Sequence, residues 1–114
     1  MTVHIKRVYE PPSTRDGYRV LVDRVWPRGV SREDAVLGEW ARELAPSKEL
    51  RQWFAHKPER FEGFRRRYRE ELSAHTGELE ALRKRSRRGT VTLLFAARDT
   101  DHNNAVVLAE LLGH

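Results

Sequence analysis

Apolar side chains are concentrated near the end of the chain, where residues 91 to 97 form a nearly continuous apolar run. Such a run is typical of a strand that is covered on both faces, as in a sheet with helices on each side, so we expect a central strand. Polar residues 98 to 102 interrupt the run, and Asp101 or Asn103 can cap a helix that follows. The apolar positions of that helix are predicted to face the sheet, and they are Val106, Val107, Leu108, Leu111 and Leu112.

Two further strands are predicted in the first quarter of the chain. Residues 3 to 9 alternate apolar and polar side chains, with Val3 and Ile5 facing inward and Val8 as a further candidate. Residues 19 to 25 form the second strand. The link at residues 11 to 17 is too short for a helical crossover. The two strands are therefore either an antiparallel pair or separated by another strand, and the pattern leaves both arrangements open.

Three helices are predicted in the middle of the chain, after a stretch at residues 31 to 44 that is irregular or briefly helical. The first begins after Ser47, a suitable N-cap, and the second begins near Pro58, because proline suits the first turn of a helix. The third begins at Thr76 and ends before Gly89. The apolar stripes of the three helices are Leu50, Trp53 and Phe54; Phe61, Phe64, Tyr68 and Leu72; and Leu79 and Leu82.

These elements indicate an α/β fold, with a small sheet of three to four strands and helices packed on it. A chain of 114 residues fits a single compact domain, so residues 1–114 are assigned to one domain. The charge balance favours acidic partners, because 22 lysines and arginines against 17 aspartates and glutamates give a formal net charge of +5. Nucleotides, phosphorylated metabolites and nucleic acid are partners of this kind.

Several kinds of site are excluded or disfavoured by what the sequence lacks. There is no cysteine, so disulfides, thiolate nucleophiles and cysteine-based metal centres are excluded. The first residues lack the apolar segment of a signal peptide, and no apolar run reaches the roughly 20 residues that a membrane span requires. We therefore expect a cytoplasmic protein with no membrane partner. Asp99 and His102 alone do not complete a metal motif, so neither metal nor cofactor is predicted, and the oligomeric state is left open.

The best candidate site lies where two strands end in polar loops. If the second and last strands run parallel, their carboxyl ends meet at one edge of the sheet, where open α/β sheets usually bind ligands. Arg24 and Arg28 supply guanidinium groups for a phosphate or carboxylate, Trp26 supplies an aromatic surface, and Asn103 supplies a further polar group. We predict that these four residues bind a small anionic ligand that is phosphate-like or nucleotide-like.

Asp99 and His102 are the candidate catalytic residues at the same edge. A carboxylate and an imidazole can move protons near neutral pH, and with the arginines stabilising negative charge they would suit hydrolysis or group transfer. The structural alternative is that Asp99 pairs with Arg24 or Arg28 to hold the two loops together. His56, at a helix end, is assigned mainly to the helix dipole. Whether the protein is an enzyme is left open.

A family resemblance rests on five separated segments, namely residues 24–29, 44–47, 50–54 with His56, 68–72, and 94–99 with 102–105. In these segments the chain resembles the YeaO-like family of bacterial domains of unknown function, over nearly its whole length and in order. The resemblance implies a compact α/β domain but no particular reaction. The chain is also distantly similar to longer members of the same superfamily, in which a Cys-His-Arg motif ends the last strand. Residues 101 to 104 contain no cysteine here, so thiol chemistry is not implied.

A basic run near the end of the third helix supports an alternative function. Residues 83 to 88 read Arg-Lys-Arg-Ser-Arg-Arg, which is most simply a solvated helix end whose charges complement the helix dipole. The alternative is a basic, non-enzymatic domain that binds nucleic acid. The run has no interleaved aromatic residues, and the sequence has no helix-turn-helix or zinc-finger pattern, so this alternative ranks second.

Overall fold

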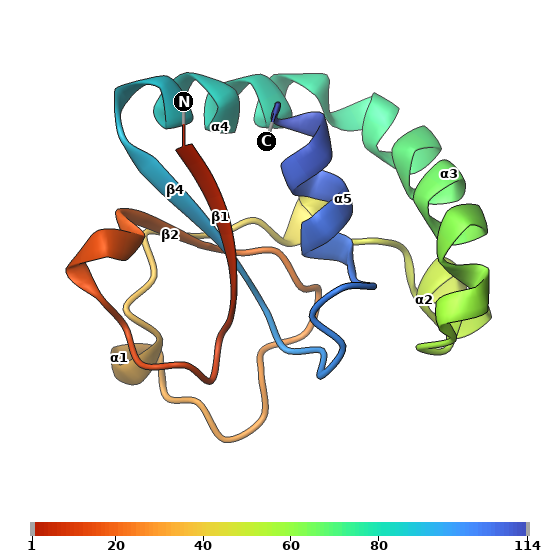
Figure 1. Cartoon of the computed structure of the whole chain (residues 1–114), viewed down its shortest axis with the longest axis horizontal. Coiled ribbons are helices and arrows are strands. Elements are labelled where there is room, and N and C mark those ends of the chain that lie inside the picture. Colours follow the sequence, from red (N-terminus) through yellow and green to blue (C-terminus); the bar gives the residue numbers. More distant parts are fainter. Residues whose placement is uncertain (1, 114) are drawn as a thin grey trace.

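The fold is a four-stranded parallel sheet with helices packed on it, which confirms the predicted α/β class. The computed structural model describes residues 2–113 (Figure 1). Its strands are β1 (Thr2–Arg7), β2 (Tyr18–Leu21), β3 (Glu39–Trp40) and β4 (Thr90–Phe95). Their order in the sheet is β1-β4-β2-β3, and every pair is parallel. The first two strands of the chain are thus separated by β4, which decides between the two predicted arrangements.

β4 is a central strand, as predicted, and its side chains alternate between the two faces of the sheet. Val91, Leu93 and Phe95 enter the main core, whereas Leu94 enters a smaller core on the opposite face. All four side chains are buried. The continuous apolar run in the sequence follows from this burial on both faces.

The smaller core is covered by an irregular segment and not by a long helix. Trp26, Leu37 and Trp40 pack there against Leu21 and Leu94. The only α-helix of this segment is the single turn α1 (Arg32–Ala35), which lies apart from the other helices in Figure 1. Long helices, which the apolar run suggested for both faces, therefore pack on the main core only.

Four longer helices surround the main core, close to where the sequence places them. They are α2 (Lys48–Phe54), α3 (Phe61–Leu72), α4 (Thr76–Arg88) and α5 (Asn104–Leu111). The side chain of Ser47 caps α2 by accepting a hydrogen bond from the Leu50 N–H at 3.1 Å, and Asn103 caps α5 by accepting one from the Val106 N–H at 3.0 Å. None of the helices described in residues 2–113 is long and apolar enough to cross a membrane.

The stretch predicted to be irregular contains a short strand that the pattern did not indicate. β3 pairs with β2, and the Ala41 N–H extends this pairing by donating to the Leu21 carbonyl at 2.8 Å. Four 3-10 turns connect the other elements, at Thr14–Asp16, Arg42–Leu44, Pro58–Arg60 and Ser73–His75.

The ends of β2 and β4 bring two distant loops together. The Val22 N–H donates to the Leu94 carbonyl at 3.1 Å, and the Ala96 N–H donates to the Asp23 carboxylate at 2.9 Å. The second strand was predicted at residues 19 to 25, but β2 spans Tyr18–Leu21. It stops before Asp23, which binds the Ala96 N–H through its side chain and not through its backbone. In Figure 1 the loops that follow β2 and β4 both lie below the sheet.

Candidate functional site

A cavity of about 450 Å³ opens at the carboxyl ends of β2 and β4, between the loops that follow these strands and α2. This volume lies within the range of small-molecule sites in proteins. Its lining residues include the apolar Phe54, Phe64 and Pro27 and the basic Arg24, Arg28 and Arg51.

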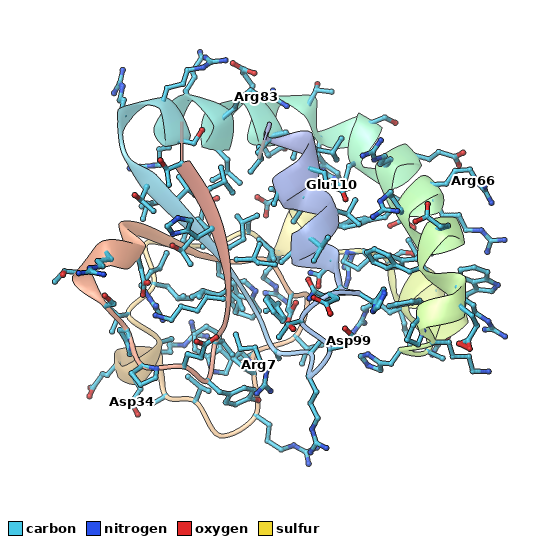
Figure 2. All side chains as sticks on the ribbon, in the orientation of Figure 1. Arg7, Asp34, Arg66, Arg83, Asp99 and Glu110 are labelled. Carbon is cyan, nitrogen blue, oxygen red and sulfur yellow. The ribbon has the colours of Figure 1, made fainter. Side chains whose placement is uncertain are left out.

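Five of the six predicted site residues line this cavity. Arg24, Trp26 and Arg28 reach it from the loop after β2, and His102 and Asn103 reach it from the loop before α5. The sixth residue, Asp99, lies in the loop that leads into α5 but is not part of the cavity wall (Figure 2). The two loops thus meet as the sequence predicted, with the carboxylate of Asp99 set back from the cavity.

The three arginines differ in how far protein groups engage them. Arg24 donates from Nε to the Pro46 carbonyl at 3.3 Å, which is a long hydrogen bond. Arg28 and Arg51 are exposed, and within residues 2–113 neither guanidinium has a hydrogen bond or ion pair with another side chain. Guanidinium groups in this condition can offer their donors to a carboxylate or phosphate.

Asp99 holds the loop and the His102 ring together. One carboxylate oxygen accepts hydrogen bonds from the Asp101 N–H at 2.9 Å and the His102 N–H at 3.0 Å. The other lies 2.9 Å from Nδ1 of His102. The hydrogen bond from Asp101, together with those from His102, lowers the pKa of Asp99 below its usual 3.8 despite some burial. A carboxylate with a lowered pKa is a weaker proton acceptor, so Asp99 is better placed to orient His102. It pairs with this ring and not with Arg24 or Arg28.

His102 is held on two sides and lines the cavity. Its Nδ1 faces Asp99, and its ring meets Phe61 edge to face with the centroids 5.2 Å apart. Within residues 2–113 its Nε2 has no hydrogen-bond partner. That nitrogen is the group through which His102 can contact a ligand.

Asn103 and Trp26 are more engaged in the fold than the sequence suggests. The Asn103 amide caps α5 through Oδ1 and donates from Nδ2 to the Asp99 carbonyl at 2.9 Å, so both of its polar atoms are used. Trp26 donates from Nε1 to the Val30 carbonyl at 2.6 Å, and the guanidinium of Arg32 lies 4.6 Å from its ring centroid. Both residues therefore shape the cavity wall, and Trp26 has less free aromatic surface than predicted.

Asp23 and Asn104 line the cavity but were not among the site residues predicted from the sequence. Asp23 accepts a hydrogen bond from Nδ2 of Asn104 at 3.1 Å, in addition to the one from the Ala96 N–H. Burial raises the pKa of Asp23 above 3.8 and outweighs the effect of these hydrogen bonds and of Arg51, which lower it. Both partners of Asp23 are far away in the sequence. The adjacent Arg24 was the only signal in the sequence that pointed to this position.

Arg51 and His56 also line the cavity and come from α2 and the turn after it. Ala55 and His56 both have left-handed backbone angles, with φ values of 49° and 56°, which end the helix and turn the chain. The sequence placed His56 correctly at a helix end but gave no indication that this end faces the cavity. Within residues 2–113, no three histidine or acidic side chains gather as metal ligands.

The basic run on α4 is largely engaged within the protein. Arg83 donates to the Leu111 carbonyl at 2.8 Å and to Glu80 at 2.6 Å, and Arg87 lies 3.6 Å from Glu80. The Arg85 guanidinium lies 3.7 Å from the centroid of the Tyr18 ring. Fewer of these charges are thus free for a polyanion than the sequence suggests.

Comparison with known proteins gives a consistent family assignment. A family model described as "Inactive DUF488-N3 subclade" matches residues 2–114. The chain is 48% identical over 110 residues to the uncharacterized protein Rv3073c of Mycobacterium tuberculosis, which covers 96% of this chain and 92% of that protein. It is 43% identical over 112 residues to the uncharacterized protein YeaO of Escherichia coli, which covers 98% of this chain and 97% of that protein. No solved structure gives a significant match.

Proposed function

The chain belongs to the YeaO-like family, within the inactive DUF488-N3 subclade, and from this premise we propose that it binds a small anionic ligand in the cavity without converting it. The ligand is phosphate-like or nucleotide-like. The word "inactive" in the description of the subclade supports binding over turnover. Asp99, a candidate catalytic residue of the sequence, is not part of the cavity wall, and its lowered pKa makes its own carboxylate a weaker proton acceptor.

The charge of the cavity carries the proposal. Arg24, Arg28 and Arg51 line it together with a single acidic residue, Asp23, so the formal charges of the lining residues sum to +2 with the histidines neutral. A phosphate monoester carries about −1.5 to −2 charges at pH 7 and matches this excess better than a monocarboxylate does. Arginine is also the side chain best suited to binding phosphate oxygens in pairs.

The size and walls of the cavity support a ligand larger than free phosphate. Small-molecule sites of roughly 300 to 1,000 Å³ hold drug-sized ligands, and the cavity has about 450 Å³. Phe54 and Phe64 are stacked with their centroids 4.6 Å apart and present apolar surface to it. A phosphate that carries a ring would use both the charged and the apolar parts of the wall.

A binding assay with arginine variants tests the proposal. Inorganic phosphate, ribose 5-phosphate and nucleoside monophosphates would be titrated by calorimetry against wild type, Arg28→Ala and Arg51→Ala at fixed ionic strength. Each substitution is expected to weaken binding about 10- to 100-fold, because a hydrogen bond to a charged group contributes roughly 1.5 to 3 kcal/mol.

Arg66→Ala provides the matched control. Arg66 is an exposed residue of α3, is not part of the cavity wall, and points away from the body of the protein (Figure 2). This variant removes the same charge and should bind like wild type. Absence of binding by every phosphate tested, or equal weakening in Arg66→Ala and Arg28→Ala, would exclude the proposed function.

A further inference from the structure

Two hydrogen-bond acceptors stand together in the wall of the cavity. The Asp23 carboxylate uses one acceptor position of each oxygen, for the Ala96 N–H at 2.9 Å and for Nδ2 of Asn104 at 3.1 Å. A carboxylate offers about four acceptor positions, so Asp23 retains capacity for further donors. Asp23 and Asn104 both line the cavity.

The orientation of the Asn104 amide is fixed by its partners. Nδ2 lies 2.8 Å from the Val22 carbonyl and 3.1 Å from Oδ1 of Asp23. Both partners are acceptors, so the nitrogen must face them and the oxygen must face away. Within residues 2–113, Oδ1 of Asn104 has no hydrogen-bond donor.

Both acceptors are held in position by hydrogen bonds. Asn104 lies in the first turn of α5, is buried and donates to the Val22 carbonyl just after β2, and Asp23 accepts the N–H of Ala96 just after β4. The Asp23 backbone carbonyl also accepts a hydrogen bond from Nε1 of Trp40 at 2.8 Å. Fixed acceptors in a partly buried wall discriminate strongly, because a ligand that displaces water without supplying a donor leaves them unpaired.

We propose that Asp23 and Asn104 determine ligand specificity by accepting hydrogen bonds from an N–H or O–H group of the bound phosphate compound. This inference rests on the proposed function, because it assigns the uncharged part of the same ligand. The arginines bind the anionic group, and the two acceptors select a compound that also carries a donor, such as the amino group of a nucleobase or the hydroxyl groups of a sugar.

Matched pairs of nucleotides separate these two sources of the donor. Adenosine 5′-monophosphate and purine riboside 5′-monophosphate differ in one base amino group. Adenosine 5′-monophosphate and its 2′,3′-dideoxy analogue differ only in the sugar hydroxyls. Wild type is expected to bind the donor-bearing member of at least one pair about tenfold more tightly.

Asp23→Asn should act in opposite directions on two ligands. It removes a negative charge from the cavity, so inorganic phosphate should bind more tightly, by about twofold or more. It also removes a charged acceptor, so the preference within the discriminated pair should fall to about twofold or less. Comparing ratios for two ligands on one protein cancels any uniform effect of the substitution on folding.

The outcomes distinguish the two proposals. Equal affinity of wild type for both members of every pair, with binding still dependent on Arg28, would overturn the specificity role and leave the anion site intact. A preference that persists unchanged in Asp23→Asn would overturn it as well. The wild-type comparison alone remains decisive if Asp23→Asn does not fold.

Discussion

The Asp99 carboxylate lies 2.9 Å from Nδ1 of His102 and also accepts the His102 backbone N–H at 3.0 Å. One acidic side chain thus fixes both the backbone and the ring of the histidine that lines the cavity. Because Nδ1 faces Asp99, Nε2 is the ring nitrogen that remains without a hydrogen-bond partner among residues 2–113. The predicted acid and imidazole are neighbours in space, but only His102 lines the cavity. Asp99 lies behind it in the loop and holds its ring.

The pKa of Asp99 is expected to lie below the ordinary aspartate value of 3.8, and the pKa of Asp23 above it. Hydrogen bonds from Asp101 and His102 lower the pKa of Asp99, whereas burial raises the pKa of Asp23. Carbon NMR titration of the aspartate carboxyl groups, assigned with Asp99→Asn and Asp23→Asn, measures both values directly. A pKa of Asp99 above that of Asp23 would contradict the hydrogen-bond pattern described here.

The same shifts set the sign of each residue's effect on stability. The folded pKa of Asp99 is lowered, so its ionised form stabilises the fold above pH 3.8 and this contribution is lost as the pH falls through the folded value. Asp23 has the opposite effect on stability. Because its folded pKa is raised, its contribution to the free energy of unfolding is present at low pH and is lost as the pH rises through the folded value. The free energy of unfolding, measured with urea, should therefore differ less between wild type and Asp99→Asn as the pH falls below 3.8. The exposed Asp34→Asn variant is the control.

Gly17→Ala should destabilise the fold strongly. Gly17 has a φ of +63°, and a Cβ there would collide with the backbone carbonyl of Thr90 at the start of β4. Gly29 has a φ of +79°, but among the described residues no atom lies within 4 Å of the place a Cβ would take. Gly29→Ala is expected to cost about 1 kcal/mol from backbone strain, and Gly17→Ala about 2 to 5 kcal/mol, because overpacking is added. Equal losses in chemical denaturation would show that the contact with Thr90 is unimportant.

Local periodicity was sufficient to predict the helices. Phe61, Phe64, Tyr68 and Leu72 recur at helical spacing, and all four are buried on one face of α3. The information needed for α3 therefore lies within about three turns of chain. The same holds for the caps, since Ser47 and Asn103 each bind an N–H three residues later.

The remaining features depend on contacts between distant segments, which a pattern does not encode. β3 has only two residues and exists through its pairing with β2, so no alternation could reveal it. Asp23 lies 73 residues from Ala96 and 81 from Asn104, the two groups that bind its carboxylate. The candidate site was predictable as two loops at strand ends, but not the acceptors within it.

Tyr68→Phe tests a buried hydrogen bond of the main core. The Tyr68 hydroxyl is fully buried and donates to the Leu44 carbonyl. Its removal leaves that carbonyl without its partner, and we expect a loss of about 1 to 2 kcal/mol in the free energy of unfolding. Tyr9, 45% exposed with its hydroxyl donating to the Arg28 carbonyl, is the matched control. Tyr9→Phe should change stability by no more than about 0.5 kcal/mol, since water can replace the contact.

Arg85 and Lys84 are adjacent on α4 but should differ in their effect on stability. The Arg85 guanidinium stacks over Tyr18, whereas Lys84 is exposed and has no ion pair within the described residues. Arg85→Ala is expected to cost about 0.5 to 1 kcal/mol through the lost cation–π contact, and Lys84→Ala to be neutral. Thermal unfolding of the two variants under the same conditions makes the comparison, and equal midpoints would argue against a stacking role for Arg85.

The nucleic-acid alternative depends on the charges of α4 that remain free. Lys84 and Arg88 are exposed, whereas Arg83, Arg85 and Arg87 contact Glu80, Tyr18 or Leu111. Binding through this face would release counterions and weaken steeply with salt. We expect Lys84→Glu/Arg88→Glu to bind a labelled oligonucleotide no differently from wild type in fluorescence anisotropy, and to retain the phosphate affinity of the cavity. A tenfold or larger loss of oligonucleotide binding at about 0.15 M salt, with phosphate affinity intact, would instead favour a nucleic-acid-binding domain, because only charges outside the cavity wall are changed.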